Sequence, residues 1–212
     1  MSIVPAEPIT GAAEHEIAGR SLNWWGMIFF IASEALIFAN LIAAYFYLEI
    51  RGNSSGVHMP WKLPNGEHLD FAFPLINTFI LLASSIPVRI AGAGIVKNNR
   101  RNLILGLLGT IILGSIFLGG QAYEYTNLFG QHFNPQYQSF GSGFFTLTGF
   151  HGLHVTVGVI FLLVVLIRSL RGDFTAQNHF AVQAAEMYWH FVDFVWVVVF
   201  TSVYLLPLLI VP

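Results

Sequence analysis

The chain has 212 residues, of which 55% are hydrophobic and only 9% are charged. A water-soluble domain carries about 25% charged residues because its surface must face water, so most of the surface of this chain must face lipid. The net charge of −2 is too small to indicate a nucleic acid or an acidic substrate as a partner. The sequence has no Cys, which excludes disulfides, thiolate metal sites and iron–sulfur ligation.

The first 21 residues form a polar segment of mixed charge, with Glu7, Glu14, His15 and Arg20 among them. A cleavable signal peptide would need a basic start followed by an early apolar stretch. We therefore expect residues 1–21 to be a polar tail, and the apolar run that begins near Leu22 to act as its own insertion signal.

Five later segments are apolar over roughly 20 residues or more, the length needed to cross a bilayer core of about 30 Å. The sequence therefore predicts an all-α integral membrane protein, with a single five-helix transmembrane domain over residues 22–212. Pro87 falls inside the second span, where we expect a kink. Three pairs of small residues four positions apart predict close helix packing: Ser115 with Gly119, Thr148 with Gly152, and Gly152 with Thr156. The predicted spans are about 22–49, 71–95, 102–125, 143–168 and 181–208.

The distribution of basic residues predicts the orientation of the bundle. Seven of the nine Lys and Arg residues fall on one side of the predicted membrane, and only Arg51 and Lys62 fall on the other. Cytoplasmic loops carry the excess of Lys and Arg, so we expect the N-terminus in the cytoplasm and the C-terminus outside. The seven are Arg20, Arg89, Lys97, Arg100, Arg101, Arg168 and Arg171.

Glu34 lies about twelve residues into the first span, which places it roughly 18 Å along the helix and near the bilayer centre. A carboxyl group at that depth must be protonated, hydrogen-bonded or hydrated. Two interpretations stay open: a role in proton handling, or a neutral acid that bonds a neighbouring helix.

Four polar residues of the fifth span, Gln183, Glu186, His190 and Asp193, are spaced three, four and three positions apart. On a helix they fall within about 80° of one another, so they form one polar stripe. Such a stripe must face protein or water. It predicts an internal hydrogen-bond network, with a proton path as the alternative.

His151 and His154 lie three positions apart in the fourth span, on one helix face. With His190 they could bind a metal or haem, but a structural metal site needs three or four protein ligands, and we expect no metal here. His154 and His190 have similar predicted depths, roughly 17 Å and 14 Å from opposite faces. We therefore expect them to meet in a polar layer between the fourth and fifth spans.

Further polar residues lie near the ends of the spans. Gln121 and Glu124 share a face at the outer end of the third span, where we expect interhelical hydrogen bonds. His179 and Arg171 lie near the inner surface, where lipid headgroups are candidate contacts on electrostatic grounds.

Several peptides resemble those of subunit III of the haem–copper oxidases, above all of cytochrome c oxidase. They are Trp-Gly-Met-Ile-Phe-Phe-Ile-Ala-Ser-Glu at 25–34, Pro-Leu-Ile-Asn-Thr at 74–78 with Leu-Leu-Ala-Ser-Ser at 81–85, Gln-Ala-Tyr-Glu-Tyr at 121–125, Gly-Phe-His-Gly-Leu-His at 149–154 and Tyr-Trp-His-Phe-Val-Asp-Phe-Val-Trp at 188–196. Asn178-His179-Phe180 also fits. The likeness covers nearly the whole chain from Trp25, and it maps Glu34 onto the buried carboxylate of the family.

The resemblance implies a subunit without a redox centre of its own, in a complex whose haem and copper lie in partner subunits. It implies that the chain supports the catalytic subunit in reducing oxygen to water, in proton uptake and pumping, and in active-site stability. The implied partners are subunit I as the main contact, subunit II and membrane phospholipid, in a bacterial plasma membrane, with a larger respiratory assembly also possible. Longer family members have seven helices, and this chain matches the last five. The alternatives are subunit III of a quinol oxidase, a small haem- or metal-binding membrane protein, and a proton-coupled transporter.

Overall fold

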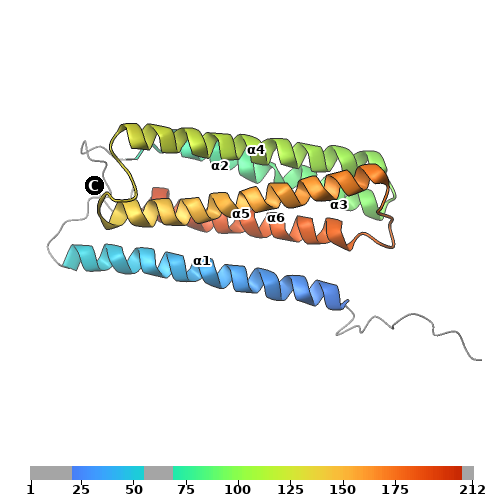
Figure 1. Ribbon diagram of the computed structural model, residues 1–212, viewed down its shortest axis with the longest axis horizontal. Coiled ribbons are helices and arrows are strands. Elements are labelled where there is room, and N and C mark those ends of the chain that lie inside the picture. The colour runs from blue at the N-terminus through green and yellow to red at the C-terminus, as the bar shows by residue number, and fades with distance from the viewer. Residues whose placement is uncertain (1–20, 55–68, 207–212) are drawn as a thin grey trace, which may run out of the picture.

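The computed structural model describes residues 21–54 and 69–206, and every regular element in these ranges is helical. Five helical stretches in this part of the chain are long and apolar enough to span a membrane, so the predicted all-α bundle of five spans is confirmed. Residues 1–20 of the predicted tail and the end of the last predicted span, residues 207–208, lie outside the described residues. In chain order the elements are α1 (Leu22–Ser54), α2 (Ala72–Ala83), α3 (Ser85–Val96), α4 (Arg100–Gly130), α5 (Gln138–Arg171), α6 (Phe180–Phe200) and the π-helical turn η1 (Thr201–Leu205) (Figure 1).

The second span is two helices, with the break at Ser84. Pro87 has no N–H to donate to the carbonyl of Ala83, four residues earlier, and its ring crowds that carbonyl. The Ser84 carbonyl lies 3.4 Å from the Thr110 hydroxyl on α4, which has a shorter bond of 2.9 Å to the Gly106 carbonyl of its own helix. The interruption predicted from Pro87 is confirmed by the end of α2 at Ala83 and the start of α3 at Ser85.

Two helix ends show how local chemistry sets the length of a span. α4 begins after Asn99, whose side chain accepts from the backbone N–H of Asn102 at 3.1 Å, and it continues to Gly130, five residues past the predicted end. The prediction stopped where the apolar residues stop, whereas helical hydrogen bonds continue through polar residues. α5 ends at Gly172, which has φ 87°, a left-handed conformation that glycine adopts without strain.

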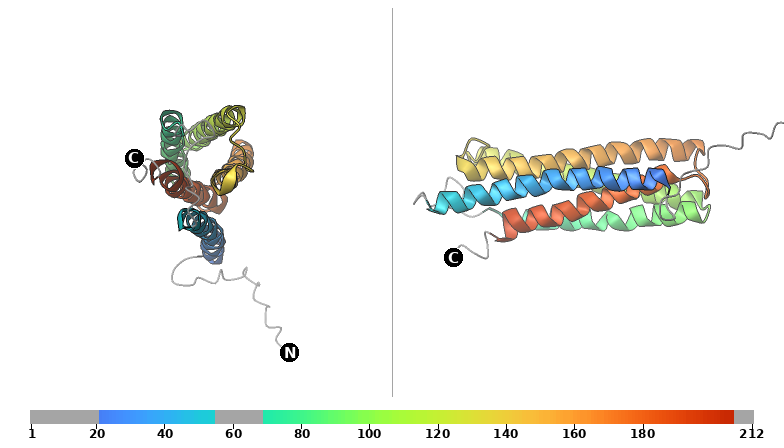
Figure 2. Two further views of the ribbon diagram at one scale, coloured as in Figure 1. Left: turned by 90° about the vertical axis from the view of Figure 1, so that its left-hand side faces the viewer. Right: turned by 90° about the horizontal axis from the view of Figure 1, so that it is seen from below.

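α6 is the central helix of the bundle, and α1 lies at its edge. α6 contacts α1, α2, α3 and α5, whereas α1 packs against α5 and α6. The end-on view in Figure 2 shows α1 set to one side of the group formed by the other helices. The largest side chains of α6, Trp189 and Trp196, are buried.

Glycines on α4 and α5 provide the space for Trp189. A Cβ atom added at Gly114 would lie 2.6 Å from the Trp189 ring, and one added at Gly158 would lie 3.0 Å from it. The small residues predicted to pack closely are different ones: Gly119 and Gly152 have open space where a side chain would project. Spacing of four identifies a stripe of small residues but not the direction in which it points, so the prediction was wrong for these two glycines.

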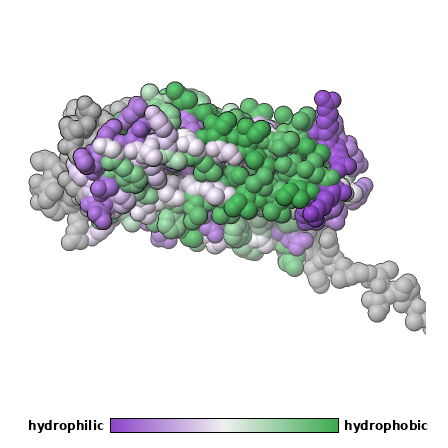
Figure 3. Space-filling model, turned by 45° about the horizontal axis from the view of Figure 1, so that its top comes forward, coloured by the Kyte–Doolittle hydropathy of each residue, from purple (hydrophilic) through white to green (hydrophobic). Residues whose placement is uncertain are grey.

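The outer surface is apolar along the spans. Large hydrophobic side chains such as Phe29, Ile116 and Leu163 are exposed, as expected of groups that contact lipid. Figure 3 shows apolar residues over half of the visible face, and hydrophilic residues gathered at the end where α3 ends and α4 begins. This surface agrees with a multi-pass membrane protein.

Candidate functional site

Glu34 on α1 contacts His154 on α5. The distance from Glu34 Oε2 to His154 Nε2 is 3.0 Å, and the side chains are 20% and 12% exposed. The other ring nitrogen, Nδ1, lies 2.7 Å from the carbonyl oxygen of Phe150 on the same helix. Because a carbonyl only accepts, Nδ1 must carry a proton, and a second proton is shared between the imidazole and the carboxyl group. We call this pair the α1–α5 pair.

The predicted meeting of His154 with His190 is not what the structure shows. His154 turns to α1, whereas His190 on α6 contacts Ser85 on α3. Similar depth fixes the height of two residues in a membrane but not the direction of their side chains around each helix. The contact from α6 to His154 is the Tyr188 hydroxyl, which donates to the His154 backbone carbonyl at 3.4 Å.

The polar stripe of α6 faces α3 and forms a four-residue group, which we call the α3–α6 cluster: Ser85, Glu186, His190 and Asp193. Glu186 Oε1 lies 3.8 Å from His190 Nε2, and His190 Nδ1 lies 3.1 Å from Ser85 Oγ. The Ser85 hydroxyl donates to Asp193 Oδ2. Since that hydroxyl has one proton, His190 Nδ1 must donate to Ser85 Oγ, which leaves Nε2 facing Glu186.

Gly92 of α3 makes room for this cluster. A Cβ at that position would lie 2.1 Å from Glu186 Oε2, so the carboxyl group rests against the α3 backbone. The side chains of Glu186 and His190 are 26% and 37% exposed, whereas Asp193 is buried. The cluster is therefore open at one end and closed at the other.

His151 is fully buried in an aromatic setting. Its ring centroid lies 4.6 Å from that of Trp196 and 5.8 Å from that of Phe117. Within the described ranges neither ring nitrogen has a hydrogen-bond partner, and the side chain of Gln121 likewise has none. Both were expected in an interhelical network. For His151 the reason is that the neighbouring rings offer no conventional acceptor.

The three imidazoles considered as metal ligands lie in separate environments: His151 between aromatic rings, His154 against Glu34, and His190 against Ser85. Among the described residues no group of three or more His, Asp or Glu side chains is placed to hold a metal ion.

At the other end of the spans, Glu124 and Tyr125 both contact neighbouring helices. Glu124 Oε1 accepts from the Tyr204 hydroxyl at 2.7 Å. The Tyr125 and Thr148 hydroxyls lie 2.7 Å apart. These contacts connect α4 to η1 and to α5.

The sequence reasoning missed a set of indole hydrogen bonds. Trp189 Nε1 donates to Ser84 Oγ at 2.8 Å, and Trp196 Nε1 donates to Thr78 Oγ1 at 2.9 Å. A signal was present: an indole N–H buried in an apolar span needs an acceptor, and the second span offers hydroxyls at both positions. These bonds fasten α6 to the broken second span.

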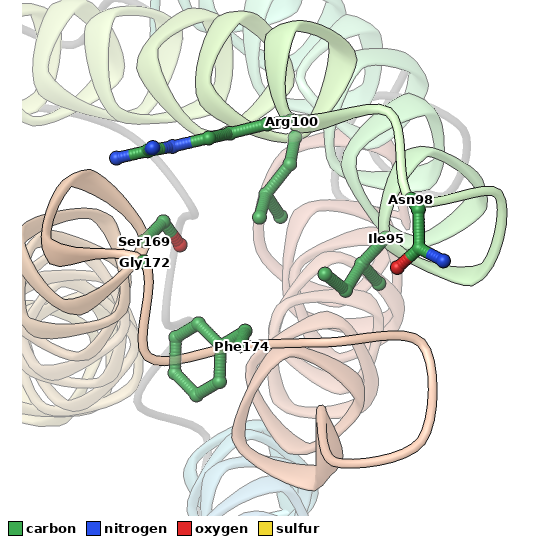
Figure 4. A pocket seen from close by; sticks show the side chains of 7 residues that line it. Ile95, Asn98, Arg100, Ser169, Gly172 and Phe174 are labelled. Atoms are coloured by element: carbon green, nitrogen blue, oxygen red, sulfur yellow. The ribbon is translucent and has the colours of Figure 1, made fainter.

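The basic end of the bundle holds a small cavity of about 230 Å³ between the α3–α4 turn and the end of α5 (Figure 4). Arg100 reaches across it, and its Nη2 donates to the Leu170 carbonyl at 2.5 Å. Asn98 Oδ1 accepts from the backbone N–H of Ala176 at 3.0 Å. The α3–α4 turn is therefore hydrogen-bonded to the loop between α5 and α6. Nearby, His179 Nε2 lies 3.0 Å from Gln183 Nε2, and Arg171 is exposed.

Comparison with known proteins places this arrangement in a family. The model of the family described as cytochrome c oxidase subunit III matches residues 5–207. The chain belongs to the cytochrome c oxidase subunit III family. All the residues of the α1–α5 pair and the α3–α6 cluster lie inside the matched range.

Individual relatives agree with the family model. The chain is 40% identical over 197 residues to cytochrome c oxidase subunit 3 of Thermostichus vulcanus, covering 92% of each chain. It is 42% identical over 183 residues to that of Pan troglodytes and 41% identical over 183 residues to that of Homo sapiens, in each case covering 85% of this chain and 68% of the relative. Membership in the cytochrome c oxidase subunit III family makes the chain a component of an oxidase complex with other subunits.

Proposed function

We propose that this chain is the subunit III of a respiratory haem–copper terminal oxidase that takes electrons from cytochrome c. In this role it carries no redox centre and supports the catalytic subunit during oxygen reduction, proton uptake and pumping. The observation that carries the proposal is identity of 40% along 92% of both this chain and the relative from Thermostichus vulcanus, since a partial domain match would not extend over five spans.

The proposal places haem and copper in the partner subunits, with subunit I as the main contact and subunit II also present. Bound phospholipid and a larger respiratory assembly are compatible with it. The exposed apolar side chains of the spans are suited to contact both lipid and partner helices. The proposed location is a bacterial plasma membrane.

Within this chain we assign Glu34 to proton-related work, through its shared proton with His154. His190, Asp193 and Glu124 are assigned to bonds that hold neighbouring helices together, and Glu186 packs against α3 at Gly92. His151 and Gln121, which were expected to share this role, make no side-chain hydrogen bond within the described ranges. His179 and Arg171 are assigned to lipid headgroups, because both lie where the basic residues of the bundle gather.

Purification in mild detergent tests the class of complex. We expect a partner that contains haem and copper to co-purify with this chain, and the complex to consume oxygen with reduced cytochrome c. Oxidation of a quinol but not of cytochrome c would favour the quinol oxidase alternative. A Soret absorption band from the isolated chain would instead favour a haem-binding protein and overturn the proposal.

The proposed orientation, with the N-terminus in the cytoplasm, has its own test. Because the chain has no Cys, single cysteines introduced at Asn98 and at Gln131 can be labelled selectively. A membrane-impermeant thiol reagent applied from outside should label the Gln131→Cys variant and leave Asn98→Cys unlabelled. The reverse pattern would invert the orientation.

A further inference from the structure

The three imidazoles inside the spans differ in the groups with which their ring nitrogens can exchange protons. His151 has no hydrogen-bond partner in the described part of the chain. His154 has Glu34 on one nitrogen and a backbone carbonyl on the other, and a carbonyl cannot pass a proton onward. His190 alone among the three has a proton-exchanging side chain on each side, Glu186 near Nε2 and Ser85 at Nδ1.

We infer that the α3–α6 cluster is a proton relay in which His190 and Ser85 carry protons between Glu186 at the open end and Asp193 at the closed end. A histidine exchanges protons readily near neutral pH and can bind one at either nitrogen, which suits it to this position. The relay goes beyond the subunit role proposed above and does not depend on it.

Each step of the relay moves a proton along a contact of the structure. The Glu186 carboxyl group gives its proton to His190 Nε2. His190 Nδ1 gives its proton to Ser85 Oγ, and the Ser85 hydroxyl gives its own proton to Asp193 Oδ2. One proton leaves Glu186 and one arrives at Asp193, and no other bond is broken. The imidazole ends as the other tautomer and returns when the proton flows back.

The gap of 3.8 Å between Glu186 and His190 is too long for a direct hydrogen bond and is the length at which a water or a small side-chain movement connects two groups. Both side chains are partly exposed, so the rest of the chain does not enclose this end. The other end is different: Asp193 is buried at 5% exposure, and its Oδ1 has no partner among the described residues. The relay therefore delivers its proton to Oδ2 of a buried carboxyl group.

The helix that carries the relay connects it to the basic end of the bundle. His179, Gln183, Glu186, His190 and Asp193 alternate four and three positions apart, so they share one face over roughly 21 Å of helix. His179 and Gln183 are already in contact. The cation on the α3 side is Arg89, one turn beyond Ser85 and exposed.

Glu124 and Glu34, by comparison, each contact a single side chain of the described ranges. Glu124 accepts from Tyr204, and Glu34 is paired with the backbone-bonded His154. Neither is followed by a further exchanging group in the described ranges. In the α3–α6 cluster, the imidazole of His190 bonds Ser85 on one side and lies 3.8 Å from Glu186 on the other, so it has an exchanging side chain on each side.

The test follows the proton on Asp193 directly. The chain has three aspartates, Asp70, Asp173 and Asp193, and the first two lie exposed outside the helices. Labelling the aspartate carboxyl carbons with ¹³C therefore marks a single carboxyl group inside a span. The full-length chain in lipid nanodiscs is subjected to a rapid pH jump, and the labelled carboxyl band is followed by infrared spectroscopy.

We expect Asp193 to change its protonation after the jump, and His190→Phe to slow this change by about tenfold or more. His154→Phe is the matched control, because it alters the same residue type on α5 and should leave the Asp193 rate unchanged. Ser85→Ala should also slow the change, and Ser85→Thr, which keeps a hydroxyl, should restore the rate. This serine pair decides the matter if His190→Phe does not fold.

Three results would overturn the relay. The first is an Asp193 band that does not respond to the jump in the unaltered chain. The second is an unchanged rate in His190→Phe and in Ser85→Ala. The third is an equal slowing in His154→Phe, which would indicate a general loosening of the bundle.

Discussion

The edge helix α1 and the central helix α6 are both apolar spans with polar residues near mid-membrane, but they are held in different ways. Trp189 of α6 fills a slot between two glycines and bonds Ser84. Between α1 and α6, by contrast, lies an apolar cavity of about 280 Å³ that Ala35 and Ala39 help to line. Helices in lipid gain no hydrophobic driving force from one another and associate by close packing and hydrogen bonds. α6 has both, whereas α1 is loosely packed and relies more on its pair with His154.

The largest effect is expected where α6 is packed most closely. Gly114→Ala places a Cβ 2.6 Å from the rigid Trp189 ring, and we expect it to lower the unfolding free energy by about 2 kcal/mol. Reversible unfolding in bicelles measures this. Gly119→Ala is the control, since open space surrounds that position, and it should change the stability little. Equal losses at the two glycines would mean that the slot does not hold α6.

The next effect concerns the indole bonds of α6. Thr78→Val removes the acceptor of the Trp196 N–H and should destabilise the chain by about 1 kcal/mol, because a buried donor is left without a partner. Thr156→Val is the matched control, because that hydroxyl is exposed and bonds the carbonyl of Gly152 on its own helix. The same unfolding measurement applies, and a Thr156 variant as unstable as the Thr78 variant would contradict the prediction.

The α1–α5 pair should contribute less. Glu34→Leu and His154→Leu, made singly and together, should give a coupling energy of about 0.6 kcal/mol, typical of hydrogen bonds between membrane helices. A coupling as large as the effect at Thr78 would show that α1 is held as firmly as α6.

Glu34→Gln keeps a hydrogen-bonding side chain beside His154. We expect the oxidase complex to assemble normally and its oxygen consumption to change only modestly, because the main proton route lies in another subunit under the proposed function. Respirometry of the purified complex measures this. A complex that assembles but does not turn over would show that Glu34 is essential.

The smallest expected effect is the coupling energy between the α1–α5 pair and the α3–α6 cluster. Because His154 and His190 contact different helices, replacing both with Phe should give stability losses that add within about 0.5 kcal/mol. A larger departure from additivity in unfolding experiments would mean that the two regions act as one.

The number of spans, the break near Pro87 and the family could be predicted from the sequence. Each of these features depends on local composition or on a contiguous peptide. The residues that contact His154 and His190 could not be predicted from the sequence. Spacing places residues on one face of their own helix, but which neighbour that face meets depends on the rotation of each helix in the bundle. The same limit explains why Gly119 was chosen instead of Gly114.

A serine of the candidate site was also missed, because its role gives no clear signal in the sequence. Ser85 connects His190 to Asp193, yet a serine in an apolar span is common and commonly bonds its own helix, as Ser202 does to Val198. Pro87 was the available indication, since it predicts a change in the helix close to Ser85.

The contact between Glu34 and His154 joins residues 120 positions apart, and this has a consequence for biogenesis. At about 10 residues per second, a ribosome needs roughly ten seconds to make the intervening chain. During that interval the first helix is already in the bilayer, its carboxyl group lacks the histidine, and the helices it packs against do not exist. The carboxyl group of the newly inserted α1 must therefore be protonated or hydrated until α5 arrives. Although α1 is the first helix to be made, it completes its contacts only after α5 and α6 exist.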